Sequence, residues 1–123
     1  MVRPLALLFH SNLLLGNQLA NRLQDLGYRV QVLSSLADLA QEAERDKPLV
    51  VVAEFSARTD LASAVTALKA NPSTQHIPVL AYSAETRKEL PETLTKAGVS
   101  MLASSAGILD QLPQLLDRIL DLE

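Results

Sequence analysis

Short, nearly continuous apolar runs alternate along this chain with longer segments in which apolar residues recur at about every third or fourth position. The runs are too short and too continuous for amphipathic helices and indicate buried strands, whereas the wider spacing predicts helices. Such alternation favours repeated strand–helix units and a parallel sheet. The expected strands cover residues 5–9, 28–33, 49–53, 77–82 and 99–103.

The helical segments carry recognisable start and stop signals. Asn12 is suited to cap the first helix, which has a leucine stripe and ends at Gly27. Further helices are expected over residues 36–45, 61–70, 85–97 and 109–122. Pro91 lacks an amide proton, so helix 85–97 either starts near Leu90 or is kinked at Pro91. About five strand–helix units with right-handed crossovers predict an α/β three-layer sandwich, with the strand order left open.

Composition narrows the class of protein. A chain of 123 residues suits one domain, 1–123, and 48% apolar residues supply a core. It has no cysteine, which excludes a disulfide framework and a thiolate metal site. The 11 Lys and Arg are scattered among 14 acids, unlike a nucleic-acid binder, and no apolar run is long enough to span a membrane. We expect a soluble, cytoplasmic domain that binds neither nucleic acid nor membrane.

Polar side chains follow three of the expected strands. His10 and Ser11 follow the first strand, Glu54 follows the third, and Ser83 follows the fourth. An open α/β sheet places its ligands at the carboxyl ends of its strands, so these residues form the candidate site.

Three stretches of the sequence are similar to segments of a known protein family. The strongest is 71–84, Asn-Pro-Ser-Thr-Gln-His-Ile-Pro-Val-Leu-Ala-Tyr-Ser-Ala, and the others are 26–30, Leu-Gly-Tyr-Arg-Val, and 97–99, Ala-Gly-Val. In their order and spacing they resemble the receiver domain of bacterial response regulators over nearly the whole chain. The resemblance implies a flavodoxin-like fold with the sheet order 2-1-3-4-5.

The resemblance also implies roles for the strand ends. Receivers accept a phosphoryl group on an Asp at the end of the third strand, where this chain has Glu54. They bind magnesium with an acidic pair at the end of the first strand, where His10 and Ser11 stand. Ser83 matches the hydroxyl residue that contacts the phosphoryl group.

Two further positions depart from the family. Its Lys just after the fifth strand is replaced by Ser104 or Ser105, and the aromatic residue that rotates on activation corresponds to Met101. Phosphoryl transfer depends on positioning and charge neutralisation, and magnesium prefers carboxylate oxygens. Glu54 is also one methylene longer than Asp, and a displacement of about 1 Å can cost ~100-fold in rate. We therefore expect no phosphorylation, no bound metal and no cofactor.

The leading hypothesis is a non-enzymatic, receiver-like (pseudo-receiver) module that signals through protein–protein contacts. In the family the interaction face combines the fourth helix, fifth strand and last helix, which is also a common dimerisation surface. The corresponding residues here are Arg87, Lys88, Glu89, Lys96, Met101, Gln111, Gln114, Asp117 and Arg118. No output domain follows Glu123, so we expect any effect to be exerted in trans.

Alternatives stay open at this stage. Glu54 is either a fixed mimic of a phosphoryl group, bonded to Ser83 or Ser104, or a carboxylate that points to water. His10 either pairs with Glu54 or is a surface imidazole. The domain could also be an active phosphoacceptor, or a binder of a small anion or nucleotide in the vacated pocket. A Ser-His hydrolase is disfavoured because no nucleophile-elbow glycine pattern is present, and His76 has no partner at metal-ligand spacing.

Overall fold

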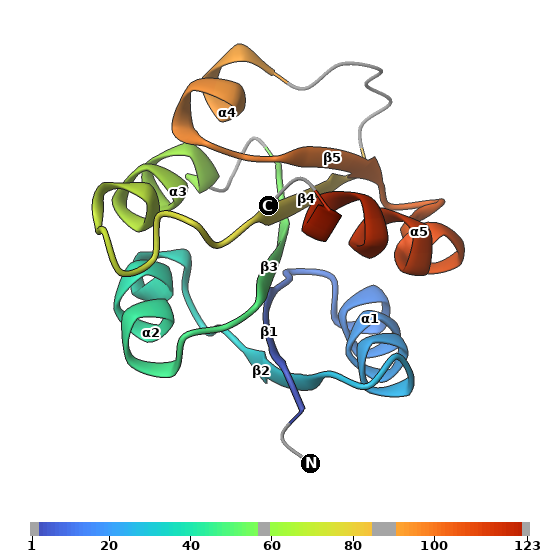
Figure 1. Ribbon diagram of the computed structural model, residues 1–123. Coiled ribbons are helices and arrows are strands. Elements are labelled where there is room, and N and C mark those ends of the chain that lie inside the picture. Colours follow the sequence, from blue (N-terminus) through green and yellow to red (C-terminus); the bar gives the residue numbers. More distant parts are fainter. Residues whose placement is uncertain (1–2, 57–59, 85–90, 122–123) are drawn as a thin grey trace.

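The computed structural model of the chain describes residues 3–56, 60–84 and 91–121. The strands are β1 Leu5–Phe9, β2 Arg29–Val32, β3 Val50–Glu54, β4 Val79–Ser83 and β5 Met101–Ser104. The helices are α1 Leu13–Asp25, the 3₁₀ turn η1 Leu36–Asp38, α2 Leu39–Asp46, α3 Leu61–Ala70, α4 Glu92–Ala97 and α5 Ile108–Asp121. Figure 1 shows these elements as three layers, with the sheet in the middle.

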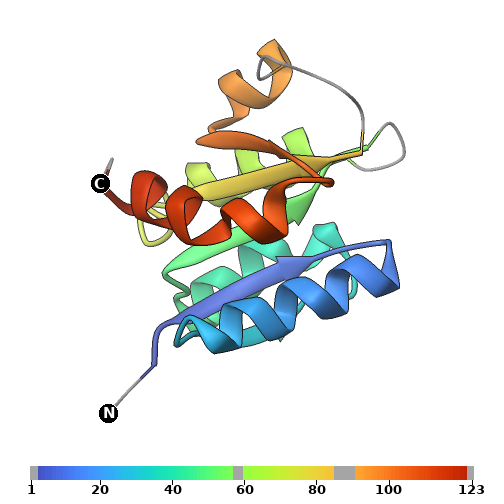
Figure 2. The same cartoon turned by 90° about the vertical axis from the view of Figure 1, so that its right-hand side faces the viewer.

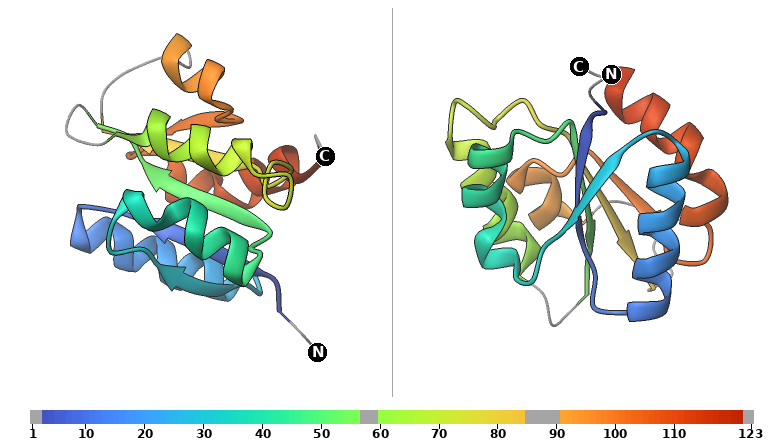
Figure 3. Two further views of the ribbon diagram at one scale, coloured as in Figure 1. Left: turned by 90° about the vertical axis from the view of Figure 1, so that its left-hand side faces the viewer. Right: turned by 90° about the horizontal axis from the view of Figure 1, so that it is seen from below.

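The sheet is parallel, and its strand order β2-β1-β3-β4-β5 confirms the predicted fold class. Ala6 in β1 stands opposite Val30 on one side and Val50 on the other, and this register brings the strand ends to common edges. Helices α1 and α5 cover one face of the sheet, while α2, α3 and α4 cover the other (Figures 1 and 3).

Each face of the sheet has its own apolar core. Successive side chains of a strand point to opposite faces, so Leu7 and Val51 join the core under α2, α3 and α4, while Leu8 and Val52 join the core under α1 and α5. Strands buried on both faces must be apolar at every position, which explains the continuous apolar runs in the sequence. Edge strand β2 is only partly covered, and its sequence alternates between polar and apolar residues, as is typical of an edge strand.

The element boundaries differ from the sequence prediction in a few places. The segment expected as one helix over 36–45 starts with η1, where the Ser35 hydroxyl accepts a hydrogen bond from the amide of Ala37 at 3.2 Å. Pro91 stands at the N-terminal cap of α4, which agrees with a helix that starts beside this proline. The earlier part of the predicted helix, 85–90, lies outside the described residues.

Helix α5 continues through Pro113, although proline removes one helical hydrogen bond. Its buried residues Ile108, Leu112, Leu116 and Ile119 face the core under α1 and α5, and this burial outweighs the local penalty. Within the described residues, no helix combines the length and apolarity that crossing a bilayer demands.

Helix α2 ends on a residue in an unfavourable backbone conformation. Lys47 has φ 50° and ψ 64°, in the left-handed region, and its amide donates to the carbonyl of Ala43 at 2.8 Å. A side chain with a Cβ costs free energy in this region, whereas glycine adopts it freely.

We predict that Lys47→Gly raises the free energy of unfolding by about 0.5–1 kcal/mol, because glycine removes the backbone strain at this helix end. Urea unfolding followed by circular dichroism measures the change. Lys47→Ala is the matched control, since it removes the same charge but keeps the Cβ. Equal stabilities of the glycine and alanine variants would contradict the prediction.

Candidate functional site

Glu54 is the last residue of β3, so it lies at the carboxyl edge of the sheet. Figure 2 shows the end of β3 at the same edge as the turn between β1 and α1. Its Oε1 accepts hydrogen bonds from the backbone amides of Ser11 at 3.3 Å and Asn12 at 3.4 Å. Its Oε2 accepts a hydrogen bond from the Ser11 hydroxyl. The carboxylate therefore ties β3 to the turn that precedes α1, and it does not simply point to water.

This contact has an electrostatic cause. The amides at a helix N-terminus lack helical partners and carry partial positive charge, so an anion is favoured there. Asn12 caps α1 by accepting from the amide of Leu15 at 3.1 Å, but the first turn of α1 contains no acidic residue. Glu54 supplies that negative charge from a neighbouring strand.

His10 lies against α1. A Cβ built on Gly16 would lie only 2.2 Å from Cγ of His10, so the imidazole fills the space that a side chain at Gly16 would occupy. Nδ1 of His10 is buried and has no hydrogen-bond partner in the described part of the chain. No ion pair joins His10 to Glu54 among the described residues. The ring is thus neither paired with the carboxylate nor a fully exposed surface imidazole.

The two serines at the end of β5, Ser104 within the strand and Ser105 directly after it, have different roles. Ser104 stands opposite Ser83 in the sheet register, and its hydroxyl accepts from the amide of Gly107 at 3.0 Å, which orders the loop before α5. The amide of Ser105 donates to the carbonyl of Ser83 at 2.8 Å. Ser105, and not Ser104, lines the cavity beside Glu54.

The carboxyl edge holds a small cavity of about 160 Å³. It is lined by Asn12, Leu15, Glu54, Phe55, Ser56, Ser83, Ala84 and Ser105. The structure therefore brings Glu54, Ser83 and the loop after β5 together, as the sequence predicted, with Ser11 bonded to Glu54. Among the described residues of this lining, Glu54 is the one charged group.

Tyr82 belongs to the site but was missed by the sequence analysis. It stands opposite Glu54 in the register, is fully buried, and donates its hydroxyl to the carbonyl of Phe9 at 3.4 Å. Burial, and to a lesser extent the negative charge of Glu54, raises the pKa of Tyr82 well above its usual range. The available signal was a single aromatic residue directly before Ser83 in an otherwise aliphatic strand.

The donor set at this edge does not fit the magnesium ion that receivers bind. Magnesium requires oxygen ligands in near-octahedral geometry, and proteins usually hold it through one or two carboxylates together with water. Here one carboxylate is already bonded to Ser11 and Asn12, and the imidazole of His10 faces Gly16. The described residues contain no cluster of three His, Cys, Asp or Glu able to hold a metal.

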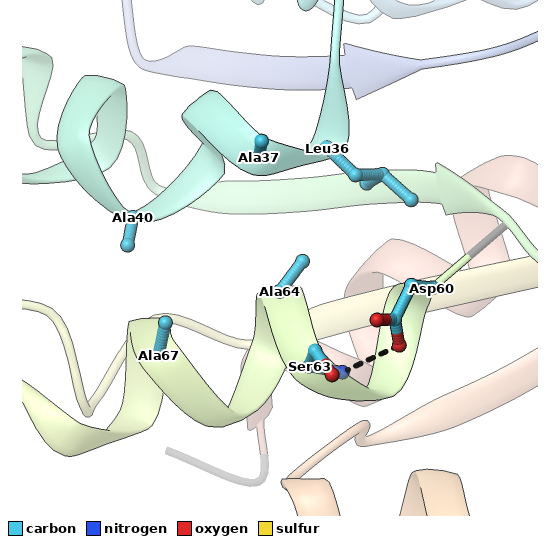
Figure 4. A pocket seen from close by; sticks show the side chains of 7 residues that line it. All are labelled: Leu36, Ala37, Ala40, Asp60, Ser63, Ala64 and Ala67. Carbon is cyan, nitrogen blue, oxygen red and sulfur yellow. Dashed lines mark hydrogen bonds between the residues drawn. The ribbon is translucent and has the colours of Figure 1, made fainter.

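A second cavity, of about 260 Å³, lies between α2 and α3 and offers little chemistry (Figure 4). Its walls are mostly alanines, including Ala40, Ala64 and Ala67. Among its described lining residues, Asp60 is the one charged group, and its carboxylate accepts a hydrogen bond from the amide of Ser63 at 3.3 Å as the cap of α3.

The predicted interaction face is formed by α4, β5 and α5, which adjoin one another in Figure 1. Gln114 and Arg118 are exposed on α5, and Lys96 on α4 pairs with Glu92 at 3.0 Å. Met101 is half-buried against the core under α1 and α5. Gln111 and Asp117 are also exposed on α5, while the predicted Arg87, Lys88 and Glu89 lie outside the described residues.

Comparisons with known proteins agree with this fold. No protein-family model matches the sequence, and no curated protein matches it significantly. One similar solved structure is the receiver domain of a sensor histidine kinase from Pseudomonas aeruginosa, which has a magnesium ion coordinated in its active-site cleft. It is 20% identical to this chain with a TM-score of 0.82, and the match covers 98% of this chain and 99% of that one. A putative response regulator from Chloroflexus aurantiacus is 16% identical with a TM-score of 0.85 and the same two coverages.

The chemotaxis protein CheY4 of Vibrio cholerae is a further structural neighbour. It is 18% identical with a TM-score of 0.82, and the match covers 96% of this chain and 99% of that one. At these identities the likeness establishes the receiver-like fold, while the chemistry must be argued from this chain's own residues.

We predict that Gly16→Ala destabilises the domain by about 1–3 kcal/mol, because the new methyl group would collide with the His10 ring. In a His10→Ala background the same change should be neutral or stabilising by up to ~1 kcal/mol, since alanine is the better helix former. Urea unfolding of the four proteins of this cycle measures the coupling. An equal loss of stability in both backgrounds would show that His10 does not pack on Gly16.

Proposed function

We propose that this chain is a receiver-like signalling module that is not phosphorylated and acts through protein partners. The observation that carries the proposal is the position of Glu54. Its carboxylate stands at the acceptor position and is bonded to the start of α1 through Ser11 and Asn12.

The charge of the cavity supports this proposal. Transfer of a phosphoryl group to a carboxylate brings two anions together and needs cations to stabilise them. The described cavity lining contains Glu54 and serine hydroxyls but no Lys or Arg. The same negative charge opposes a free anion or nucleotide, which disfavours the ligand-binding alternative at this edge.

The bonds of Glu54 also indicate what replaces phosphorylation. The Glu54 carboxylate accepts hydrogen bonds from two backbone amides and a hydroxyl, and it occupies a place at the helix start that favours an anion. Glu54 then holds the β1–α1 turn against β3 in one arrangement, without any transferred group. We propose that the domain presents a single, constant surface to its partners.

That surface is the α4–β5–α5 face. Met101, Gln114 and Arg118 are among its described members, and Arg87 and Lys88 are proposed beside them. A mostly polar face of this kind suits transient association better than an obligate interface. Self-association through the same face is a further expectation. A non-enzymatic role and a cytoplasmic location, both expected from the sequence, form part of the proposal.

Incubation of the protein with acetyl phosphate and magnesium tests the first half of the proposal. We expect intact-mass spectrometry to show no added phosphoryl group on the wild-type chain. A restored variant, His10→Asp, Ser11→Asp, Glu54→Asp and Ser105→Lys, serves as the positive control and should gain one group. Mapping a phosphoryl group to Glu54 or His10 of the wild type would overturn the proposal in favour of an active phosphoacceptor.

Capture of partners from the native cell tests the second half. We expect Arg118→Glu to weaken retention of a captured partner about tenfold relative to wild type, because charge reversal places a like charge against a complementary surface. Glu44→Lys, at an exposed position of α2, is the control, and this variant should retain the partner. Loss of partner retention in the Glu44 variant but not in the Arg118 variant would place the interface on the side of α2 and not on the α4–β5–α5 face.

A further inference from the structure

A cavity of about 360 Å³ lies at the amino edge of the sheet, opposite the edge that holds Glu54. It is lined by Arg3, Pro4, Leu5, Arg29, Lys47, Pro48, Leu49 and His76. We propose that this cavity binds a small molecule in which a phosphate group is attached to an apolar moiety.

The sheet register brings these residues together. The amide of Arg29 donates to the carbonyl of Pro4, and the amide of Leu49 donates to the carbonyl of Leu5, both at 2.8 Å. The Nε–H of Arg29 also donates to the carbonyl of Arg3 at 3.1 Å, which holds the Arg29 side chain against the first strand. The starts of β1, β2 and β3 therefore form one wall, with His76 coming from the turn before β4.

The charge of this cavity is opposite to that of the chain. The protein has 14 acids against 11 Lys and Arg, yet the described lining holds two Arg, one Lys and one His and no acid. The nearby Asp46 carboxylate accepts hydrogen bonds from the Arg45 guanidinium at 2.8 and 3.1 Å and from the Gln31 side-chain amide at 3.0 Å. Hydrogen bonds from Arg45 and Gln31 are the main causes that lower the pKa of Asp46, and the charge of Arg29 contributes least, so Asp46 compensates Arg29 only in part.

Arg3 and Lys47 have no ion pair within 3–56, 60–84 and 91–121. Lys47 is held in the left-handed conformation, where glycine would be less strained. A strained residue of this kind, at the rim of a cavity, is a reason to suspect a functional role.

The chemistry of the lining selects the ligand. Guanidinium groups bind phosphate through paired hydrogen bonds, and a lysine adds a point charge. Pro4, Leu5, Pro48 and Leu49 supply an apolar surface, and Leu49 is 43% exposed. Concave sites for small molecules combine an apolar lining with a few charged groups and have volumes of about 300–1,000 Å³. The cavity suits a small phosphate ester better than an extended acidic peptide.

An NMR titration of the full chain tests the proposal with three probes: phenyl phosphate, inorganic phosphate and benzyl alcohol. We expect saturable shifts of the backbone amides of Arg3, Arg29 and Leu49 with phenyl phosphate, weaker shifts with inorganic phosphate, and none with the uncharged alcohol. Raising the salt concentration should weaken binding, because exposed charges are screened.

Variants separate charge from structure. Lys47→Asn and Arg3→Gln should each raise the Kd for phenyl phosphate about three- to tenfold, the range for one charge-assisted contact. Asparagine tolerates the left-handed conformation at position 47, so the fold is preserved. Lys47→Arg should retain binding, and Lys96→Gln, remote from the cavity, should leave the Kd unchanged.

Several results would overturn the proposal. These are the absence of shifts at the amino edge at millimolar phenyl phosphate, shifts confined to residues around Glu54, or a Kd unchanged by Lys47→Asn and Arg3→Gln. Binding of a hexaglutamate peptide without binding of phenyl phosphate would indicate an acidic protein partner instead. The cavity lies at the edge opposite Glu54, so these outcomes are distinguishable from a failure of the proposed signalling role.

Discussion

The central strands of this domain are covered on both faces, and this burial determines where chemistry can occur. Val50, Val51, Val52 and Ala53 of β3 are fully buried, between one core under α1 and α5 and another under α2, α3 and α4. A polar or charged group in the middle of such a strand would be desolvated without compensation. Polar function is therefore restricted to the two edges of the sheet, where the strands start and end.

At the carboxyl edge, helix electrostatics decide the outcome. Glu54 follows a buried strand, and the nearest unpaired donors are the amides at the start of α1. A carboxylate in that place satisfies the helix terminus and fills the position that an incoming anion would occupy. His10, one strand away, packs on Gly16 instead of facing the carboxylate. The carboxyl edge of this receiver-like fold therefore holds Glu54 in a structural contact with the start of α1.

The amino edge shows the opposite distribution of charge. Positive residues that are far apart in the sequence, such as Arg3, Arg29 and Lys47, line one cavity there. Among the described residues, the two edges of the sheet therefore differ in the sign of their charge: the carboxylate of Glu54 lies at one edge and a cationic cavity at the other.

The sequence by itself determined the fold class, because burial on both faces forces continuous apolar runs that cannot be mistaken for amphipathic helices. It also identified Glu54 and Ser83 as site residues, since strand ends meet at one edge. It did not determine the partner of Glu54, the contact of His10 with Gly16, or the choice between Ser104 and Ser105, because these depend on register and on side-chain direction. The cationic cavity could not be predicted from the sequence, because its residues are scattered along the chain. Only the pairing of β1 with β2 and β3 brings them together.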